Sequence, residues 1–113
     1  MIKIYHNPRC SKSRQAVELL EKTGKEFEII KYLEAKFTRE SLMEVVQFLN
    51  IAPIELVRKN EKIWKENFKG TPMSDPEIVS AMVNNPKLIE RPIVIHKNKA
   101  VIGRPTSDIL SII

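Results

Sequence analysis

The stretch of sequence that decides the fold is His6-Asn7-Pro8-Arg9-Cys10-Ser11-Lys12-Ser13-Arg14. It follows a short apolar segment, residues 1–5, that predicts a strand, and it leads into residues 11–23, whose apolar side chains recur with helical spacing. A strand–loop–helix turn leaves the first N–H groups of the helix unpaired. Cys10, the only cysteine of the chain, therefore lies where the helix dipole favours thiolate over thiol.

The segments that flank this stretch predict a β–α–β unit. Gly24 is a suitable C-terminal stop for the helix. Residues 26–30 then alternate weakly and become apolar, which is typical of a second strand. Since the crossover of a β–α–β unit is right-handed, the two strands should be parallel neighbours.

The middle of the chain predicts helices only. Thr38 is a suitable N-cap for a helix whose apolar face runs to Leu49, and Pro53 can open a short helical segment. Apolar residues between 63 and 68 indicate a further helical turn or two. Ser74-Asp75-Pro76-Glu77 has the form of a capping box with proline in the first turn.

The last third changes to the period of strands. Residues 93–95 and 100–102 are apolar and are separated by the polar segment 97–99, which predicts a hairpin. Pro105 can start a short terminal helix.

This order of elements predicts an α/β fold, a thioredoxin-like four-stranded mixed sheet (βαβ, helical insertion, ββα) with helices on both faces. We expect a single domain, 1–113, with the helical insertion at approximately 38–84. A chain of 113 residues is long enough for a core without disulfides or metals.

Composition excludes several classes of protein. With 42% hydrophobic and 29% charged residues, the chain is an ordinary globular one, and it has no apolar run that could span a membrane and no signal peptide. One cysteine cannot form an internal disulfide, so we expect a cytoplasmic, reducing setting. The net charge is +5, but without a Lys/Arg block or a row of aromatics we expect no nucleic-acid partner.

Cys10 is the main candidate for chemistry. An ordinary thiol with a pKa of about 8.5 is only about 3% ionised at pH 7, and a pKa of about 6 requires roughly 3.4 kcal/mol of differential stabilisation. A helix N-terminus supplies up to about 2 kcal/mol, and a nearby guanidinium can supply the rest. The alternative is that Cys10 is a small buried hydrophobic residue.

Four residues near Cys10 are candidates for supporting it. Arg14 follows it by one helical turn, so its guanidinium could lean back over the thiol. His6 could set the charge of the thiol or orient the loop. Ser11 and Ser13 could cap the helix or donate to the thiolate. Each of these residues also has an ordinary structural explanation.

Three arginines further along the chain could form an oxyanion site. Arg91-Pro92 precedes the third strand, where a cis proline of a thioredoxin-like sheet faces the active cysteine. Arg104 leaves the fourth strand at the same edge, and Arg58 lies within the helical insertion. Each alone could be a surface arginine, but three guanidiniums around one thiolate would bind a tetrahedral oxyanion through bidentate hydrogen bonds.

The position three residues after Cys10 is Ser13, so the chain lacks a Cys-x-x-Cys pair. An oxidised Cys10 must then be restored by an outside thiol. There are too few cysteines and histidines for a zinc site, and we expect no metal and no bound cofactor.

Several motifs together resemble the glutaredoxin-coupled arsenate reductase family, nearly end to end and in order. The resemblance implies a thioredoxin-like fold, Cys10 as nucleophile, and Arg58, Arg91 and Arg104 as oxyanion ligands. His6 and Arg14 match the family's His-x-x-x-Cys-x-x-x-Arg pattern, which is associated with thiol activation. The motifs are Tyr5-His6-Asn7-Pro8-Arg9-Cys10 with Ser13-Arg14, Leu56-Val57-Arg58-Lys59-Asn60, Asn85-Pro86 leading to Arg91-Pro92-Ile93-Val94, and Arg104-Pro105-Thr106-Ser107.

The activity that the resemblance implies is reduction of arsenate to arsenite through a Cys10–arsenate adduct, with glutathione as reductant and glutaredoxin as partner. The chain stops sooner after Arg104-Pro105 than the longer members of that family, so it is more similar to the small branch. Two alternatives stay open: a redox-sensing regulator of the Spx type that binds RNA polymerase, and a thiol oxidoreductase acting on glutathione mixed disulfides. Spx-like proteins commonly carry Cys-x-x-Cys, and Ser13 argues against that branch.

Overall fold

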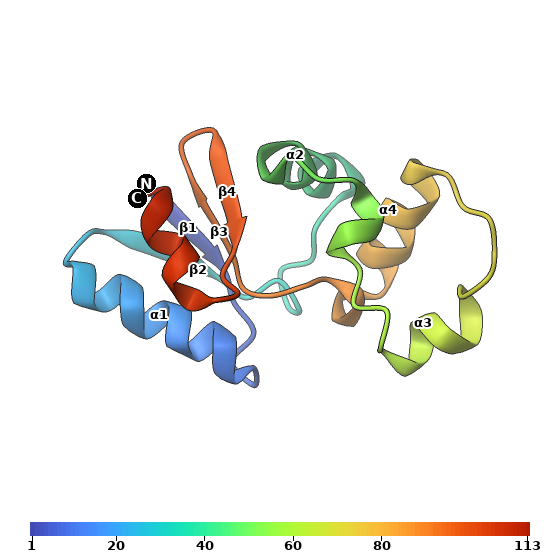
Figure 1. The fold of residues 1–113 in the computed structure, drawn as a ribbon, viewed down its shortest axis with the longest axis horizontal. Helices are drawn as coiled ribbons and strands as arrows, with labels where there is room; N and C mark the ends of the chain where they lie inside the picture. Colours follow the sequence, from blue (N-terminus) through green and yellow to red (C-terminus); the bar gives the residue numbers. More distant parts are fainter. The chain divides into compact units, whose positions relative to one another are not determined.

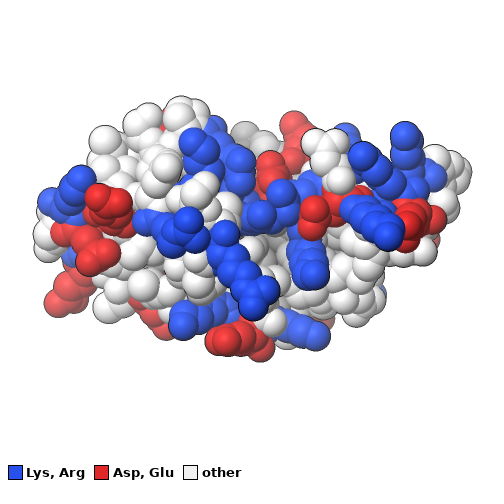
Figure 2. Space-filling view, turned by 90° about the horizontal axis from the view of Figure 1, so that it is seen from below, with Lys and Arg blue, Asp and Glu red and all other residues white.

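The computed structural model describes all residues of the chain, 1–113. The contacts divide it into two compact units: unit 1 contains Met1–Ala35 and Arg91–Ile113, and unit 2 contains Lys36–Glu90. None of the helices has the length and apolar character needed to cross a membrane. Basic side chains occur across the face drawn in Figure 2, with acidic ones between them.

Unit 1 is built on a four-stranded mixed sheet, which confirms the thioredoxin-like prediction (Figure 1). The strand order is β2-β1-β3-β4; β1 pairs in parallel with β2 and antiparallel with β3, and β3 pairs antiparallel with β4. Two helices complete the unit. The elements are β1 (Ile2–Tyr5), α1 (Ser11–Thr23), β2 (Phe27–Ile30), β3 (Ile93–His96), β4 (Lys99–Ile102) and the 3-10 helix η3 (Thr106–Ser111).

The core of unit 1 lies between one face of the sheet and both of its helices. Ile4 and Val94 are register partners and are fully buried, and they pack with Ala16 and Leu20 of α1 and Ile109 of η3. In Figure 1, α1 and η3 accordingly lie on the same side of the sheet. The two helices of this unit share one face, because the apolar residues of both converge on the same row of strand residues.

The hairpin of unit 1 forms as predicted, with a tighter turn. Both strands are one residue longer than expected, and the turn is reduced to Lys97 and Asn98. Lys97 has a φ of 58°, the left-handed conformation that two-residue hairpin turns require.

Unit 2 consists of helices, and its first long helix begins where the sequence predicts. Thr38 is the N-cap of α2 (Arg39–Leu49) and forms a capping box with Ser41. Ser74 caps α4 (Asp75–Asn84) in the same way with Glu77, so both predicted N-caps are confirmed. The other elements are η1 (Pro53–Leu56), α3 (Lys62–Asn67) and η2 (Pro86–Leu88).

A short antiparallel contact in unit 2 joins the segment after η1 to the end of η2. Val57 and Ile89 form an isolated bridge, and the N–H of Arg58 donates to the carbonyl of Leu88 over 2.7 Å. This pairing fixes the backbone of Arg58.

Candidate active site

The cysteine loop, residues 6–14, places Cys10 at the start of α1. Cys10 is itself the N-cap residue, with extended backbone angles (φ −95°, ψ 122°). Its N–H donates to the carbonyl of Asn7 over 3.0 Å, and its carbonyl accepts from the N–H of Arg14. The backbone N–H groups of Ser13 and Lys12, in the first turn of the helix, lower the pKa of the thiol. The sequence predicted this placement at the helix N-terminus.

The surroundings of Cys10 favour its ionised form. Burial of the side chain, which is 7% exposed, raises the pKa of the thiol. A hydrogen bond from the Arg91 side chain, the Arg91 charge and the N–H groups of Ser13 and Lys12 together outweigh burial, so the pKa of Cys10 is lowered from its ordinary value. The thiolate, which is the nucleophilic form, is therefore enriched near neutral pH.

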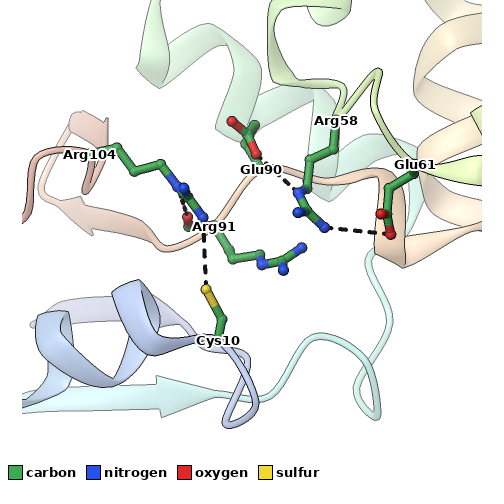
Figure 3. A network of polar contacts seen from close by, with 6 residues as sticks. All are labelled: Cys10, Arg58, Glu61, Glu90, Arg91 and Arg104. Carbon is green, nitrogen blue, oxygen red and sulfur yellow. Dashed lines mark hydrogen bonds and ion pairs between the residues drawn. The ribbon is translucent and has the colours of Figure 1, made fainter.

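Figure 3 shows the Cys10 side chain pointing toward Arg104, with the Arg91 side chain nearby. Nη2 of Arg104 lies 3.8 Å from Sγ, a long contact, and its Nε donates to the Arg91 carbonyl over 2.8 Å. The Arg91 hydrogen bond is the stronger influence on the thiol pKa. Nε of Arg91 is buried and has no hydrogen-bond partner, so one donor of this guanidinium is unsatisfied.

His6 orients the loop and is held neutral. Its Nδ1 lies 2.6 Å from the Ser13 hydroxyl, which also accepts from the N–H of Asn7 over 3.0 Å. Burial lowers the pKa of His6, and the charges of Lys31 and Arg14 lower it further. A neutral imidazole adds no positive charge to stabilise the thiolate. Of the two roles expected for His6, the structure supports orientation of the loop.

Arg14 supports the loop rather than the sulfur. Its Nη1 donates to the carbonyl of Pro8 over 2.9 Å, so the expectation that this guanidinium lies over the thiol is wrong. The expectation that a serine caps α1 is also wrong. The N-cap is Cys10, Ser11 is exposed, and Ser13 is fully buried against His6.

Two proline bonds flank the arginines that face the sulfur. The peptide bond Arg91–Pro92 is cis, as the sequence allowed, and Arg104–Pro105 is cis as well, which the sequence did not indicate. The Pro92 carbonyl accepts from the N–H of Gly103 over 2.9 Å, which ties the entrance of β3 to the exit of β4.

Arg58 lies in unit 2 and is balanced there by two carboxylates (Figure 3). Its Nε is 3.3 Å from Oε1 of Glu90, and its Nη1 is 3.5 Å from Oε1 of Glu61. We refer to these three residues as the Arg58 cluster. The assignment of Arg58 as an oxyanion ligand stays a prediction. Sequence analysis missed both carboxylates; only Glu61, three residues after Arg58, had a spacing that could have indicated it.

The site of unit 1 combines a thiolate, guanidinium donors and helix N–H groups, a set suited to attack on an electrophile that carries negatively charged oxygens. No group of three or more His, Cys, Asp or Glu residues could hold a metal ion. Fold and site together define a thioredoxin-like protein with a single activated cysteine.

The comparison with known proteins identifies the family. Residues 5–112 match the model of the ArsC family, and the chain belongs to that family, which confirms the resemblance.

Three relatives illustrate the match. The chain is 44% identical over 114 residues to YfgD of Escherichia coli K12, a protein described as uncharacterized, covering 99% of this chain and 96% of that protein. It is 38% identical to an arsenate reductase of Neisseria meningitidis serogroup A, over 99% and 97% of the two chains. The solved structure of an arsenate reductase from Vibrio cholerae is 41% identical and has a TM-score of 0.94, over 99% of this chain and 97% of that chain.

Proposed function

We propose that this protein reduces arsenate to arsenite with Cys10 as the nucleophile. The observation that carries the proposal is a thiol whose pKa is lowered by Arg91 and by helix N–H groups, in a chain that belongs to the ArsC family. Several of its relatives are named arsenate reductases.

In the first step the Cys10 thiolate attacks the arsenic atom. A sulfur–arsenic bond forms, one arsenic–oxygen bond breaks, and the oxygen leaves as water after taking up a proton. Arg91 and Arg104 stabilise the oxyanion of the adduct, because preorganised guanidinium donors interact most strongly with the charge that moves onto the arsenic oxygens.

In the second step glutathione resolves the adduct. Its thiolate attacks the sulfur of Cys10, the sulfur–arsenic bond breaks, and the electron pair stays on arsenic, which leaves as arsenite. The two sulfurs are oxidised to a mixed disulfide while arsenic is reduced. Since the chain has no second cysteine, a glutaredoxin thiol then takes the glutathione and restores Cys10. A reducing cytoplasm would maintain these thiols.

The test is arsenate reduction by the purified protein with glutathione and glutaredoxin, comparing the wild type with Cys10→Ser. We expect complete loss of turnover in the variant, with an unchanged melting temperature as the control for folding. Residual turnover in Cys10→Ser would refute the mechanism. A wild type that reduces a glutathionylated peptide faster than arsenate would favour a mixed-disulfide reductase instead.

A further inference from the structure

Gly103 lies in unit 1 where β4 ends, directly before Arg104, and has no role in the steps above. It is the central residue of a three-residue turn, because the N–H of Arg104 donates to the carbonyl of Ile102 over 2.8 Å. Its φ lies outside the left-handed region, so other residues can adopt this backbone conformation. The conformation of the turn is therefore not what requires a glycine here.

The space around Gly103 does require one. A Cβ atom at this position would lie 3.0 Å from Cγ of Pro92 and 3.2 Å from Cδ1 of Ile109, which is closer than ordinary van der Waals contact. Both neighbours are buried, and Ile109 belongs to the core of unit 1. Since a packed core has little room to give, a side chain at position 103 must push the Pro92 ring or Ile109 aside.

The Pro92 ring is bonded to the group that orients Arg104. Nε of Arg104 donates to the carbonyl of Arg91 over 2.8 Å (Figure 3), and this carbonyl belongs to the planar peptide group that contains the nitrogen of Pro92. A displaced Pro92 ring therefore moves the Arg91 carbonyl with it. Arg104 would then lose the alignment that places its Nη2 3.8 Å from Sγ of Cys10.

No charged group offers a second means of orienting Arg104. Its side chain is exposed, and it takes part in none of the four ion pairs of the chain. Its direction therefore depends on how closely the end of β4 approaches the start of β3. The hydrogen bond from the N–H of Gly103 to the Pro92 carbonyl, 2.9 Å long, marks that approach.

We propose that Gly103 is a positioning residue for Arg104. The absence of a side chain at this position lets the end of β4 close on Pro92, which aims the guanidinium of Arg104 at the sulfur of Cys10. The inference deepens the proposed function, on which it rests, by naming what fixes the direction of one of its guanidiniums.

The experiment measures alkylation of Cys10 by the anionic iodoacetate and by the neutral iodoacetamide. In both reactions the thiolate displaces iodide from carbon, so the ratio of the two rates cancels the fraction of thiolate and reports the positive charge beside the sulfur. Arg104→Ala should lower this ratio up to about fivefold, the effect of one exposed ion pair. Gly103→Ala should lower it by up to the same factor. In the Arg104→Ala background it should have little further effect, because both changes act on one guanidinium.

Relief of the close contact should restore the ratio. Ile109→Val removes Cδ1, the atom 3.2 Å from the new Cβ, and in the Gly103→Ala background it should recover most of the wild-type ratio. The matched control is Gly24→Ala, at a glycine with a φ of 72° and open space around it. This variant should lower the melting temperature and leave the ratio unchanged.

A Gly103→Ala protein that melts at a lower temperature but keeps the wild-type ratio would overturn the inference. Additive effects of Gly103→Ala and Arg104→Ala would overturn it too, as would a lowered ratio that Ile109→Val does not restore. The alkylation reactions need no arsenate. Failure of arsenate turnover with an intact Gly103-dependent ratio would therefore overturn the proposed function alone.

Discussion

The active site of unit 1 and the Arg58 cluster of unit 2 both contain arginines, but the arginines have different partners. In unit 1, Arg104 donates to a carbonyl and to sulfur, and Arg14 donates to a carbonyl. In unit 2, Arg58 pairs with Glu61 and Glu90. No residue of the cysteine loop takes part in an ion pair.

The difference shows how a site keeps its positive potential. A guanidinium that donates to a neutral carbonyl is oriented but keeps its full charge, whereas two carboxylates offset the charge of Arg58. The arginines of unit 1 can therefore act on the ionisation of a thiol. The two carboxylates that hold the Arg58 guanidinium in place also offset its positive charge.

Loss of Arg91 would give the largest change in this comparison. Arg91 lowers the pKa of Cys10 both by its side-chain hydrogen bond and by its charge, and a hydrogen bond to a charged group contributes about 1.5–3 kcal/mol, so Arg91→Ala should raise the pKa of Cys10. Because the pKa of this acid is lowered in the folded protein, thiolate is lost as pH falls through it, and the variant should lose thiolate at higher pH. The measurement is ultraviolet absorbance of the thiolate against pH.

The matched control for Arg91→Ala is Arg14→Ala, which removes an arginine that donates to the Pro8 carbonyl. It should shift the Cys10 pKa much less. Equal shifts in the two variants would show that general positive charge, rather than the Arg91 hydrogen bond, sets the ionisation of the thiol.

The outcome for Arg14 also shows what sequence spacing can and cannot predict. Thr38 and Ser74 were predictable as N-caps because a cap depends on residues three positions apart. The spacing of Arg14 gave its helix face correctly but not its partner, since the Pro8 carbonyl competes with the sulfur for the same guanidinium. The contact between Cys10 and Arg104 joins residues 94 positions apart. No local spacing could indicate it; the predicted sheet, which brings Arg104 to the same edge as the cysteine, and the resemblance to a family did.

The neutral state of His6 gives the next prediction. Its pKa is lowered in the folded protein, chiefly by burial, whereas the unfolded chain binds a proton below about pH 6.5. Stability should therefore fall on acidification from about pH 7 to pH 5, with a contribution from His6 of up to about 1.4 kcal/mol per pH unit. Denaturant unfolding across this range should show a smaller slope in His6→Gln, and an unchanged slope would mean that His6 titrates alike in both states.

Removing the N-cap of α2 in unit 2 should lower the stability of the fold without changing the ionisation of Cys10. The Thr38 hydroxyl accepts from the N–H of Ser41 over 3.0 Å, and Thr38→Ala should lower the free energy of unfolding by about 1 kcal/mol. The thiol titration of Cys10 should stay the same, because the variant leaves every group that lowers its pKa in place. A shifted titration would show that α2 influences the cysteine loop.

The smallest effect should come from changing the balance of charge in the Arg58 cluster. Glu90→Gln keeps an acceptor for Nε of Arg58 and removes one of its two negative partners. The side chains of this pair are 25% and 29% exposed, so the charge effect should be about 0.2–1 kcal/mol, or up to about a fivefold decrease in the KM for arsenate if Arg58 binds the anion. The control is Glu66→Gln, which changes net charge equally but removes a partner of Lys62 on α3. A lower KM in Glu90→Gln but not in Glu66→Gln would support Arg58 as an oxyanion ligand. Equal KM values in both variants would remove Arg58 from that role, because freeing its positive charge would then have no effect on substrate binding.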